Sequence, residues 1–268
     1  MILSVGCTLG YEVQTPTANF TFNILANRDT FQHVVDEGIR LTPDIPIGER
    51  TATSKGNRVF RVEAPVGAFE VNYRATVEVK RPAVPAEVKI DHPGRLPLSI
   101  LTSMLPSRYC ESDRFAQQAW DLFGKFPNRA DQVREICRWV DATLVYTPGA
   151  TDSRTSAWDA WQLKKGVCRD YTHLAIAMCR ALNIPTRYVG CYAVGLEPMD
   201  FHACFEAWLG GHWYLFDPTD GIDPNQIAVI ARGRDAANAA LTTIFGKVNA
   251  APVKVKCVLA PLDEAAVG

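Results

Sequence analysis

The sequence predicts an α+β protein in which an antiparallel β-sandwich precedes a second domain of helices followed by strands. Apolar and polar residues alternate strictly over 69–80, which is typical of a half-buried strand. Five prolines then fall within 82–106 and interrupt regular structure. Helical spacing of apolar residues follows, and strand-like segments return afterwards. We therefore expect a sandwich over 1–82, a proline-rich connector over 83–106 and a second domain over 107–268.

The first part of the chain contains five or six candidate strands separated by turn residues, a number that favours an antiparallel sandwich. Pro65-Val66-Gly67 joins the last two of them. The expected strands cover 2–13, 20–26, 34–41, 51–53, 59–63 and 69–79. No pattern in this part points to catalysis.

The second part is expected to hold three helices and then a mainly antiparallel sheet. Ser112 and Asn128 can each cap a helix N-terminus, and Asn183 with Pro185 can end the third helix. The expected helices cover 112–123, 128–144 and 168–182. The expected strands cover 187–194, 202–209, 212–217, 226–230 and 253–259.

Composition excludes several classes of protein. The formal net charge of the 268 residues is -1, without any run of Lys and Arg, so we expect neither nucleic acid nor an anionic membrane as a partner. No apolar run approaches membrane-spanning length, and the start lacks the basic region of a signal peptide. The eight cysteines form no CxxC pair, which favours reduced thiols in the cytoplasm.

Cys168 is the candidate nucleophile. Gly166 permits a turn, and apolar residues at helical spacing follow, so Cys168 should open a buried helix. The first turn of a helix presents unpaired N–H groups and the positive end of the macrodipole, both of which favour a thiolate. The carboxylate of Asp170 in the same turn has two open readings, since it complements the dipole and could also serve catalysis.

A hairpin supplies the partners of this thiol. Gly210-Gly211 predicts a two-residue turn, which sets Leu209 opposite His212 and, further out, Cys204 opposite Asp217. His202 shares the face of Cys204, so Asp217 is its diagonal neighbour across the strands. A slip of one residue in the register would place the two side chains on opposite faces.

The spacing therefore predicts a triad in which Cys168 attacks, His202 acts as base and then acid, and Asp217 orients the imidazole. His173 points about 140° away from Cys168 around the helix, and His212 lies opposite Leu209, so neither should serve the thiol. His202 and Cys204 alone do not make a tetrahedral zinc site, and we expect no metal and no organic cofactor.

Three segments occur in order along the chain and carry a resemblance to a known family. They are Gly166-Val167-Cys168-Arg169-Asp170, His202-Ala203 and Trp213-Tyr214-Leu215-Phe216-Asp217-Pro218-Thr219. They resemble the signature segments of the bacterial transglutaminase-like superfamily, and the likeness extends to 107–114, 184–188 and 233–235. The β-rich first part is similar to the N-terminal domain of many bacterial members.

The resemblance implies a papain-like, transglutaminase-core fold for the second domain, with Cys168, His202 and Asp217 as the catalytic triad. The family usually has tryptophan two residues after the histidine, where this chain has Cys204. Cys204 is therefore a candidate residue of the pocket, and the packing around the imidazole should differ. Trp208 lies further along the same strand.

The sequence specifies the residues of the pocket around the triad less closely than it specifies the triad itself. The backbone N–H of Cys168 is the natural first oxyanion donor. For the second, Gln162 has the spacing that papain-like peptidases use, while transglutaminase relatives resemble each other in using an upstream aromatic, for which Tyr146, Trp158 and Trp161 are candidates. The two tryptophans could equally be packing residues. Arg232, Arg234 and Asp235 could form a solvated turn or support the hairpin.

We expect a thiol-dependent enzyme that attacks an amide, forms a thioester and releases it to water or to an amine. Its partners would be a peptide or protein amide substrate and, for a transglutaminase, an amine acceptor. Hydrolysis as a cysteine protease or amidase and transfer use the same triad. Two alternatives stay open: acetyltransferase-like acyl transfer, and a catalytically silent protein-binding module. The sequence does not specify an oligomeric state.

Overall fold

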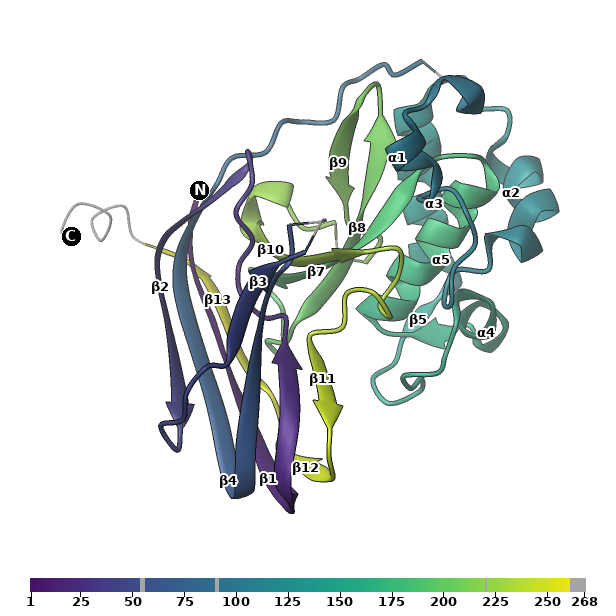
Figure 1. Ribbon diagram of the computed structural model, residues 1–268. Helices are drawn as coiled ribbons and strands as arrows, with labels where there is room; N and C mark the ends of the chain where they lie inside the picture. The colour runs from purple at the N-terminus through teal and green to yellow at the C-terminus, as the bar shows by residue number, and fades with distance from the viewer. Residues whose placement is uncertain (54–55, 90–91, 220, 261–268) are drawn as a thin grey trace.

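The computed structural model describes residues 1–53, 56–89, 92–219 and 221–260. It confirms the α+β architecture: a bent antiparallel sheet lies on one side, the helices lie on the other, and a second sheet lies between them (Figure 1). Residues 261–268, which close the expected second domain, lie outside the described residues. No helix in the described part of the chain is long and apolar enough to cross a membrane.

The first sheet has seven strands, of which four come from the N-terminal part. These are β1 (Ile2–Phe22), β2 (Gln32–Thr42), β3 (Glu49–Ala52) and β4 (Arg58–Val79). The strands expected over 2–13 and 20–26 form one strand, β1, which ends at Phe22 and not at 26, and those over 59–63 and 69–79 form β4. They are continuous because β1 and β4 pair along their whole lengths, with a register shift between Val13 and Thr17.

The long β1–β4 pair folds back on itself at that shift. Tyr11 and Phe20 lie on the same strand, yet their ring centroids are only 4.9 Å apart. An extended strand would separate them by roughly 30 Å. The bend encloses an aromatic core with Phe22 and Phe69, so the expected sandwich is one sheet packed against itself.

Three further strands of this sheet come from the far end of the chain. They are β11 (Thr242–Phe245), β12 (Val248–Ala250) and β13 (Lys254–Leu259), and all three pair with β1. The strand expected over 253–259 therefore exists, but its placement in the second sheet was wrong. Period-2 alternation predicts a strand and does not identify its partner. Here Cys257 fills the core beneath β1.

The connector and the helices follow. The described elements are η1 (Pro93–Arg95), α1 (Leu98–Leu101), η2 (Ser112–Phe115), α2 (Ala116–Phe123), α3 (Arg129–Thr143), β5 (Val145–Tyr146), α4 (Ala157–Leu163), β6 (Lys165–Gly166) and α5 (Cys168–Ala181). The Asn128 side chain caps α3 by accepting from the Ala130 N–H, as expected. Ser112 begins a 3-10 turn, so α2 starts four residues later than expected. The short helix α4 was not predicted.

The second sheet has the order β10-β7-β8-β9 and is antiparallel throughout. Its strands are β7 (Thr186–Ala193), β8 (His202–Leu209), β9 (His212–Phe216) and β10 (Ile227–Gly233), with η3 (Pro224–Gln226) before the last. The four strands expected over 187–230 are confirmed. Helix α5 is almost entirely buried and packs against β7 and β8.

Side-chain amides from the N-terminal sheet satisfy the outer edge of β10. Gln32 accepts from the Val229 N–H (2.7 Å) and donates to the Val229 carbonyl (3.0 Å). Asn57 bonds in the same two-way manner with Arg232, at 2.7 and 2.8 Å. An open strand edge is thereby closed without another strand, and the two sheets are held together by specific polar contacts.

Candidate active site

The N-terminus of α5 is built around a buried carboxylate. Asp170 accepts hydrogen bonds from the Val167 N–H (2.9 Å) and from the Thr151 hydroxyl (2.6 Å), and its side chain is fully buried. Gly166 is required for a reason other than the expected turn, because its φ is not positive. A Cβ at this position would lie 2.6 Å from the Asp170 Cβ. The glycine therefore makes room for the carboxylate that holds the helix start.

The hairpin register is confirmed. Leu209 pairs with His212 and Trp208 with Trp213, across a turn whose residues Gly210 and Gly211 have φ values of 57° and 92°. Positive φ at both central positions is the requirement of a type I′ turn, which glycine meets at little cost. The paired residues of the two strands end at Phe205 opposite Phe216, immediately before the Cys204 and Asp217 positions.

This register brings His202 and Asp217 together. The His202 Nε2 and the Asp217 Oδ2 are 2.8 Å apart, and both side chains are nearly inaccessible to solvent. Asp217 also accepts from the backbone N–H (3.0 Å) and the hydroxyl of Thr219. Since Nε2 is engaged by the carboxylate, Nδ1 is the ring nitrogen that remains for the thiol.

The electrostatics of the pair favour an imidazolium. Burial by itself lowers the pKa of His202, but interactions with the Asp217 and Cys168 side chains outweigh it and raise that pKa above its ordinary value. Burial raises the pKa of Asp217, but the hydrogen bond and the charge of His202 lower it overall. The half-buried Cys168 at the start of α5 thus lies beside a basic histidine.

The other two histidines within the second part lie elsewhere, as expected. His173 is fully buried, its Nε2 accepts from the Ala236 N–H (3.2 Å), and its ring stacks on Tyr109. Burial, aided by the charge of Arg169, lowers the pKa of His173 to about 3, so it stays neutral. His212 is exposed near the tip of the hairpin.

Cys204 does not line an open pocket. It is fully buried, its sulfur lies 3.7 Å from that of Cys191, and burial raises the pKa of both thiols. The packing near the imidazole was expected to differ from that of the family. In the structure, two small thiols fill the sheet face next to His202. Cys191 also donates to the His202 carbonyl at 3.5 Å. Cys204 is excluded from the pocket because it is buried in a cluster with apolar residues from three strands. The pattern of a single strand does not reveal such a cluster.

The candidates for the second oxyanion donor are dispersed. Tyr146 lies opposite Gly166 in the parallel β5–β6 pair, two residues from the nucleophile. Gln162 is an exposed residue of α4. Trp158 and Trp161 pack against Phe115, with ring centroids 5.4 and 5.8 Å away, which supports the packing interpretation of both tryptophans.

A buried ionic network stabilises the β8–β9 hairpin. Glu206 of β8 accepts from Arg187 and, at 3.0 Å, from Arg232, which also donates to Asp29, between β1 and β2 (2.7 Å). Burial opposes ionisation of Glu206, but the two arginines lower its pKa to about 2. Of the two roles left open for Arg232, support of the hairpin is the one observed.

One positioning residue escaped the sequence analysis. Thr172 of α5 is fully buried and its hydroxyl donates to the carbonyl of Ala203, next to His202, at 2.9 Å. Its position four residues after Cys168, on the same helix face, was the available signal. The bond links the helix that carries the thiol to the strand that carries the imidazole.

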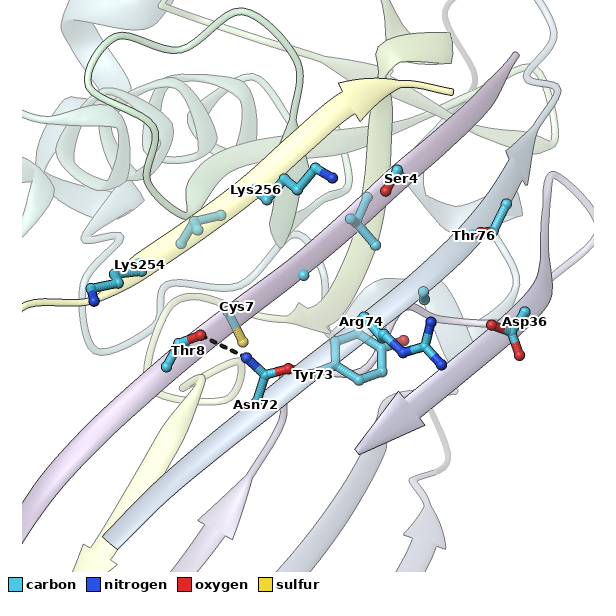
Figure 2. Close-up of a pocket in the computed structure, with 14 residues that line it drawn as sticks. Ser4, Cys7, Thr8, Asp36, Asn72, Tyr73, Arg74, Thr76, Lys254 and Lys256 are labelled. Atoms are coloured by element: carbon cyan, nitrogen blue, oxygen red, sulfur yellow. Dashed lines mark hydrogen bonds between the residues drawn. The ribbon is translucent and has the colours of Figure 1, made fainter. Parts of the chain in front are cut away.

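A separate pocket of about 440 Å³ lies on the first sheet, away from the triad (Figure 2). Side chains of β1, β2, β4 and β13 line it, and Arg74, Lys254 and Lys256 are exposed on its walls. Its one thiol, Cys7, is buried, and burial raises the pKa of that thiol to about 11. The pocket therefore lacks an activated nucleophile. The described residues contain no group of three or more His, Cys, Asp and Glu side chains arranged to hold a metal.

Two family models match consecutive parts of the chain. Residues 117–218 match the transglutaminase-like superfamily, and residues 1–87 match the bacterial transglutaminase N-terminal domain. A crystal structure of a candidate cysteine protease from Cytophaga hutchinsonii is 39% identical and superposes with a TM-score of 0.90, covering 98% of this chain and 92% of that one.

Two mycobacterial relatives, both described as uncharacterized, are more distant. The Mycobacterium leprae (strain TN) protein is 36% identical over 112 residues, and the Mycobacterium tuberculosis (strain ATCC 25618 / H37Rv) protein is 27% identical over 123 residues. The matches span 38% and 40% of this chain, and only 40% and 38% of those proteins. With both segments matched in order and a relative of the same fold matched over nearly the whole of both chains, the chain belongs to the transglutaminase-like superfamily and carries the bacterial transglutaminase N-terminal domain.

Proposed function

We propose that this protein catalyses thiol-dependent acyl chemistry at amide bonds of a peptide or protein. The observation that carries the proposal is the buried His202–Asp217 pair, 2.8 Å apart, beside a half-buried thiol on the first turn of α5. A basic imidazole and a helix N-terminus both stabilise a thiolate. Membership of the superfamily and the likeness to a candidate cysteine protease support the same reading.

In the proposed acylation, the Cys168 sulfur attacks the amide carbonyl and the carbonyl π electrons move to oxygen. The backbone N–H of Cys168, among the first-turn donors that have no partner within the helix, would stabilise this oxyanion. Tyr146 is the candidate for a second donor because its strand neighbours Gly166. The tetrahedral intermediate collapses as His202 gives its proton to the departing nitrogen, which leaves a thioester on Cys168.

Deacylation reverses these roles. His202 takes a proton from water or from an amine, which attacks the thioester and returns the sulfur to the thiolate. Water yields an acid and an amine yields a new amide, so hydrolysis and transamidation share every residue named. The buried Asp217 keeps the imidazole oriented through both half-reactions.

Two steps test the proposal. The first is a comparison of iodoacetamide alkylation at Cys168 and at Cys137, which is also half-buried but whose pKa burial raises. Selective labelling of Cys168 at neutral pH is the expected result. The second is incubation with a glutaminyl peptide and a labelled amine, with Cys168→Ala as the inactive control and Cys137→Ala as the matched one.

Mass spectrometry separates the outcomes of the second step. Conversion of glutamine to glutamate indicates hydrolysis, and incorporation of the amine indicates transfer. A parallel incubation with acetyl coenzyme A and an arylamine tests acetyltransferase-like transfer. If Cys168 is inert toward iodoacetamide and no substrate is converted, the proposal is wrong and the silent binding module remains.

A further inference from the structure

A second cavity, distinct from the triad, lies where the N-terminal sheet, the connector and the β8–β9 hairpin meet. Its volume is about 340 Å³, which is within the range of small-molecule sites. Its walls are largely apolar and aromatic, and include Phe31, Trp213 and Tyr214, while its charged lining residues are Arg81, Glu206 and Asp223. The Arg187 guanidinium lies 4.2 Å from the centre of the Trp213 ring and holds that wall in place.

One charged side chain of the cavity, Arg81, forms no direct ion pair with any described residue. Arg81 donates from Nη2 to the amide oxygen of Gln32 (3.1 Å), and its backbone N–H bonds to Asn225 (2.8 Å). Its Nε is shielded from solvent and has no hydrogen-bond partner. Among the described residues, no carboxylate forms an ion pair with this guanidinium.

The two carboxylates nearest to this guanidinium are engaged by other arginines. Glu206, which also lines the cavity, and Asp29 are ion-paired with Arg187 or Arg232. Asp223, on the exposed rim, accepts from the backbone N–H and the side-chain amide of Asn225. Burial lowers the pKa of Arg81, so a cation is kept here against a desolvation cost.

We infer that this cavity is a binding site for a small carboxylic acid with an apolar or aromatic body. The carboxylate would pair with the Arg81 guanidinium, whose planar fork suits two carboxylate oxygens. The body would lie against Trp213, Tyr214 and the proline-rich start of the connector. Such a ligand would give the Arg81 guanidinium a direct ion pair and would bridge the N-terminal sheet to the hairpin that carries Asp217. The inference does not depend on the proposed function.

Isothermal titration calorimetry with 3-phenylpropanoate tests the site, with 3-phenylpropanamide as the uncharged isostere. We expect saturable binding of the acid and at least about tenfold weaker binding of the amide, as for the loss of a charged hydrogen bond. Arg81→Gln should weaken binding of the acid to a similar extent, and Arg81→Lys should restore part of it. Arg74→Gln, an exposed arginine on β4 in the other pocket, is the matched control and should bind as the wild type does.

Cys168→Ala should also bind normally, which separates this site from the proposed chemistry. Equal affinity for acid and amide, undiminished binding by a folded Arg81→Gln protein, or no binding of the acid at millimolar concentration would each overturn the inference. If Arg81→Gln fails to fold, the acid-to-amide comparison on the wild-type protein still decides the question.

Discussion

The Thr172 hydroxyl donates to the Ala203 carbonyl at 2.9 Å, and so joins the element of the nucleophile to the element of the base. Thr172 lies one turn after Cys168 on α5, and Ala203 follows His202 on β8. Both residues are buried, so the bond is shielded from competing water. The separation of thiol and imidazole is therefore set by a direct contact between their two elements.

Replacing this hydroxyl should impair chemistry more than substrate binding. We expect Thr172→Val to lower kcat and the rate of Cys168 alkylation by about tenfold with little change in KM, because the reacting groups lose their alignment. Unfolding free energy should fall by about 1 kcal/mol, the net value of one hydrogen bond. Thr172→Ser keeps the hydroxyl and should restore both rates. An equal loss in the serine variant would show that the methyl group, not the hydrogen bond, matters.

Gly166→Ala should disturb the start of α5. The added Cβ would lie 2.6 Å from the Asp170 Cβ, so the carboxylate would lose its bond to the Val167 N–H. We expect a loss of about 1 to 2 kcal/mol in urea unfolding, as for other helix caps, and slower alkylation of Cys168. Gly48→Ala is the matched control, since the atom nearest to its new Cβ is 3.6 Å away. Similar losses in the two variants would contradict the packing explanation.

Glu206→Gln should destabilise the protein strongly at neutral pH, by about 3 to 5 kcal/mol, because Arg187 and Arg232 would lose their shared carboxylate. The folded-state pKa of Glu206 is depressed to about 2, so its contribution is present above the ordinary glutamate pKa of about 4.3 and is lost as pH falls toward 2. Urea unfolding at several pH values should show the gap between wild type and variant narrowing on the acid side. A gap that is constant with pH would refute this electrostatic assignment.

Asp217→Asn should abolish most of the proposed activity while the hairpin remains folded. We expect kcat to fall by roughly 10²- to 10⁴-fold, because the amide cannot hold an imidazolium as the carboxylate does. His212→Gln, on the exposed part of the same hairpin, is the control and should leave kcat unchanged. Retention of full activity by Asp217→Asn would remove the third member of the triad.

The same variant carries a prediction for the pH dependence of stability. The folded-state pKa of His202 is raised, so its pairing contributes fully below the ordinary histidine pKa of about 6.5 and is lost as pH rises through the raised value. The folded-state pKa of Asp217 is lowered, so its contribution disappears only in acid. The stability gap between wild type and Asp217→Asn should therefore be largest near pH 6 and shrink toward alkaline pH, as measured by chemical unfolding.

Local chemistry was enough to predict much of the proposed site. The Gly210-Gly211 turn admits one register, and that register alone places His202 diagonal to Asp217. Helical spacing after Cys168 likewise located the start of α5 to the residue. Both are decided within a few residues of chain, where turn geometry and side-chain period leave few alternatives.

Other features depended on contacts between distant segments. The burial of Cys204 arises from residues of three strands, and the packing of Trp158 and Trp161 from Phe115, more than 40 positions earlier. The reason for Gly166 became apparent only with the Asp170 side chain in place. None of these partners is specified by the pattern around the residue itself.

By itself, then, the sequence determined the three main helices, the four strands of the second sheet, the hairpin register and the identity of the candidate triad, because period and turn chemistry act locally. The tertiary structure decided that β11, β12 and β13 return to pair with β1, and that Gln32 and Asn57 close the edge of β10. It also decided that Arg81 lines a cavity without a direct ion pair to any described carboxylate. Which strands pair and which charged groups lie close together depend on contacts between segments that are far apart in the sequence. The alternation of residues along one strand does not specify those contacts.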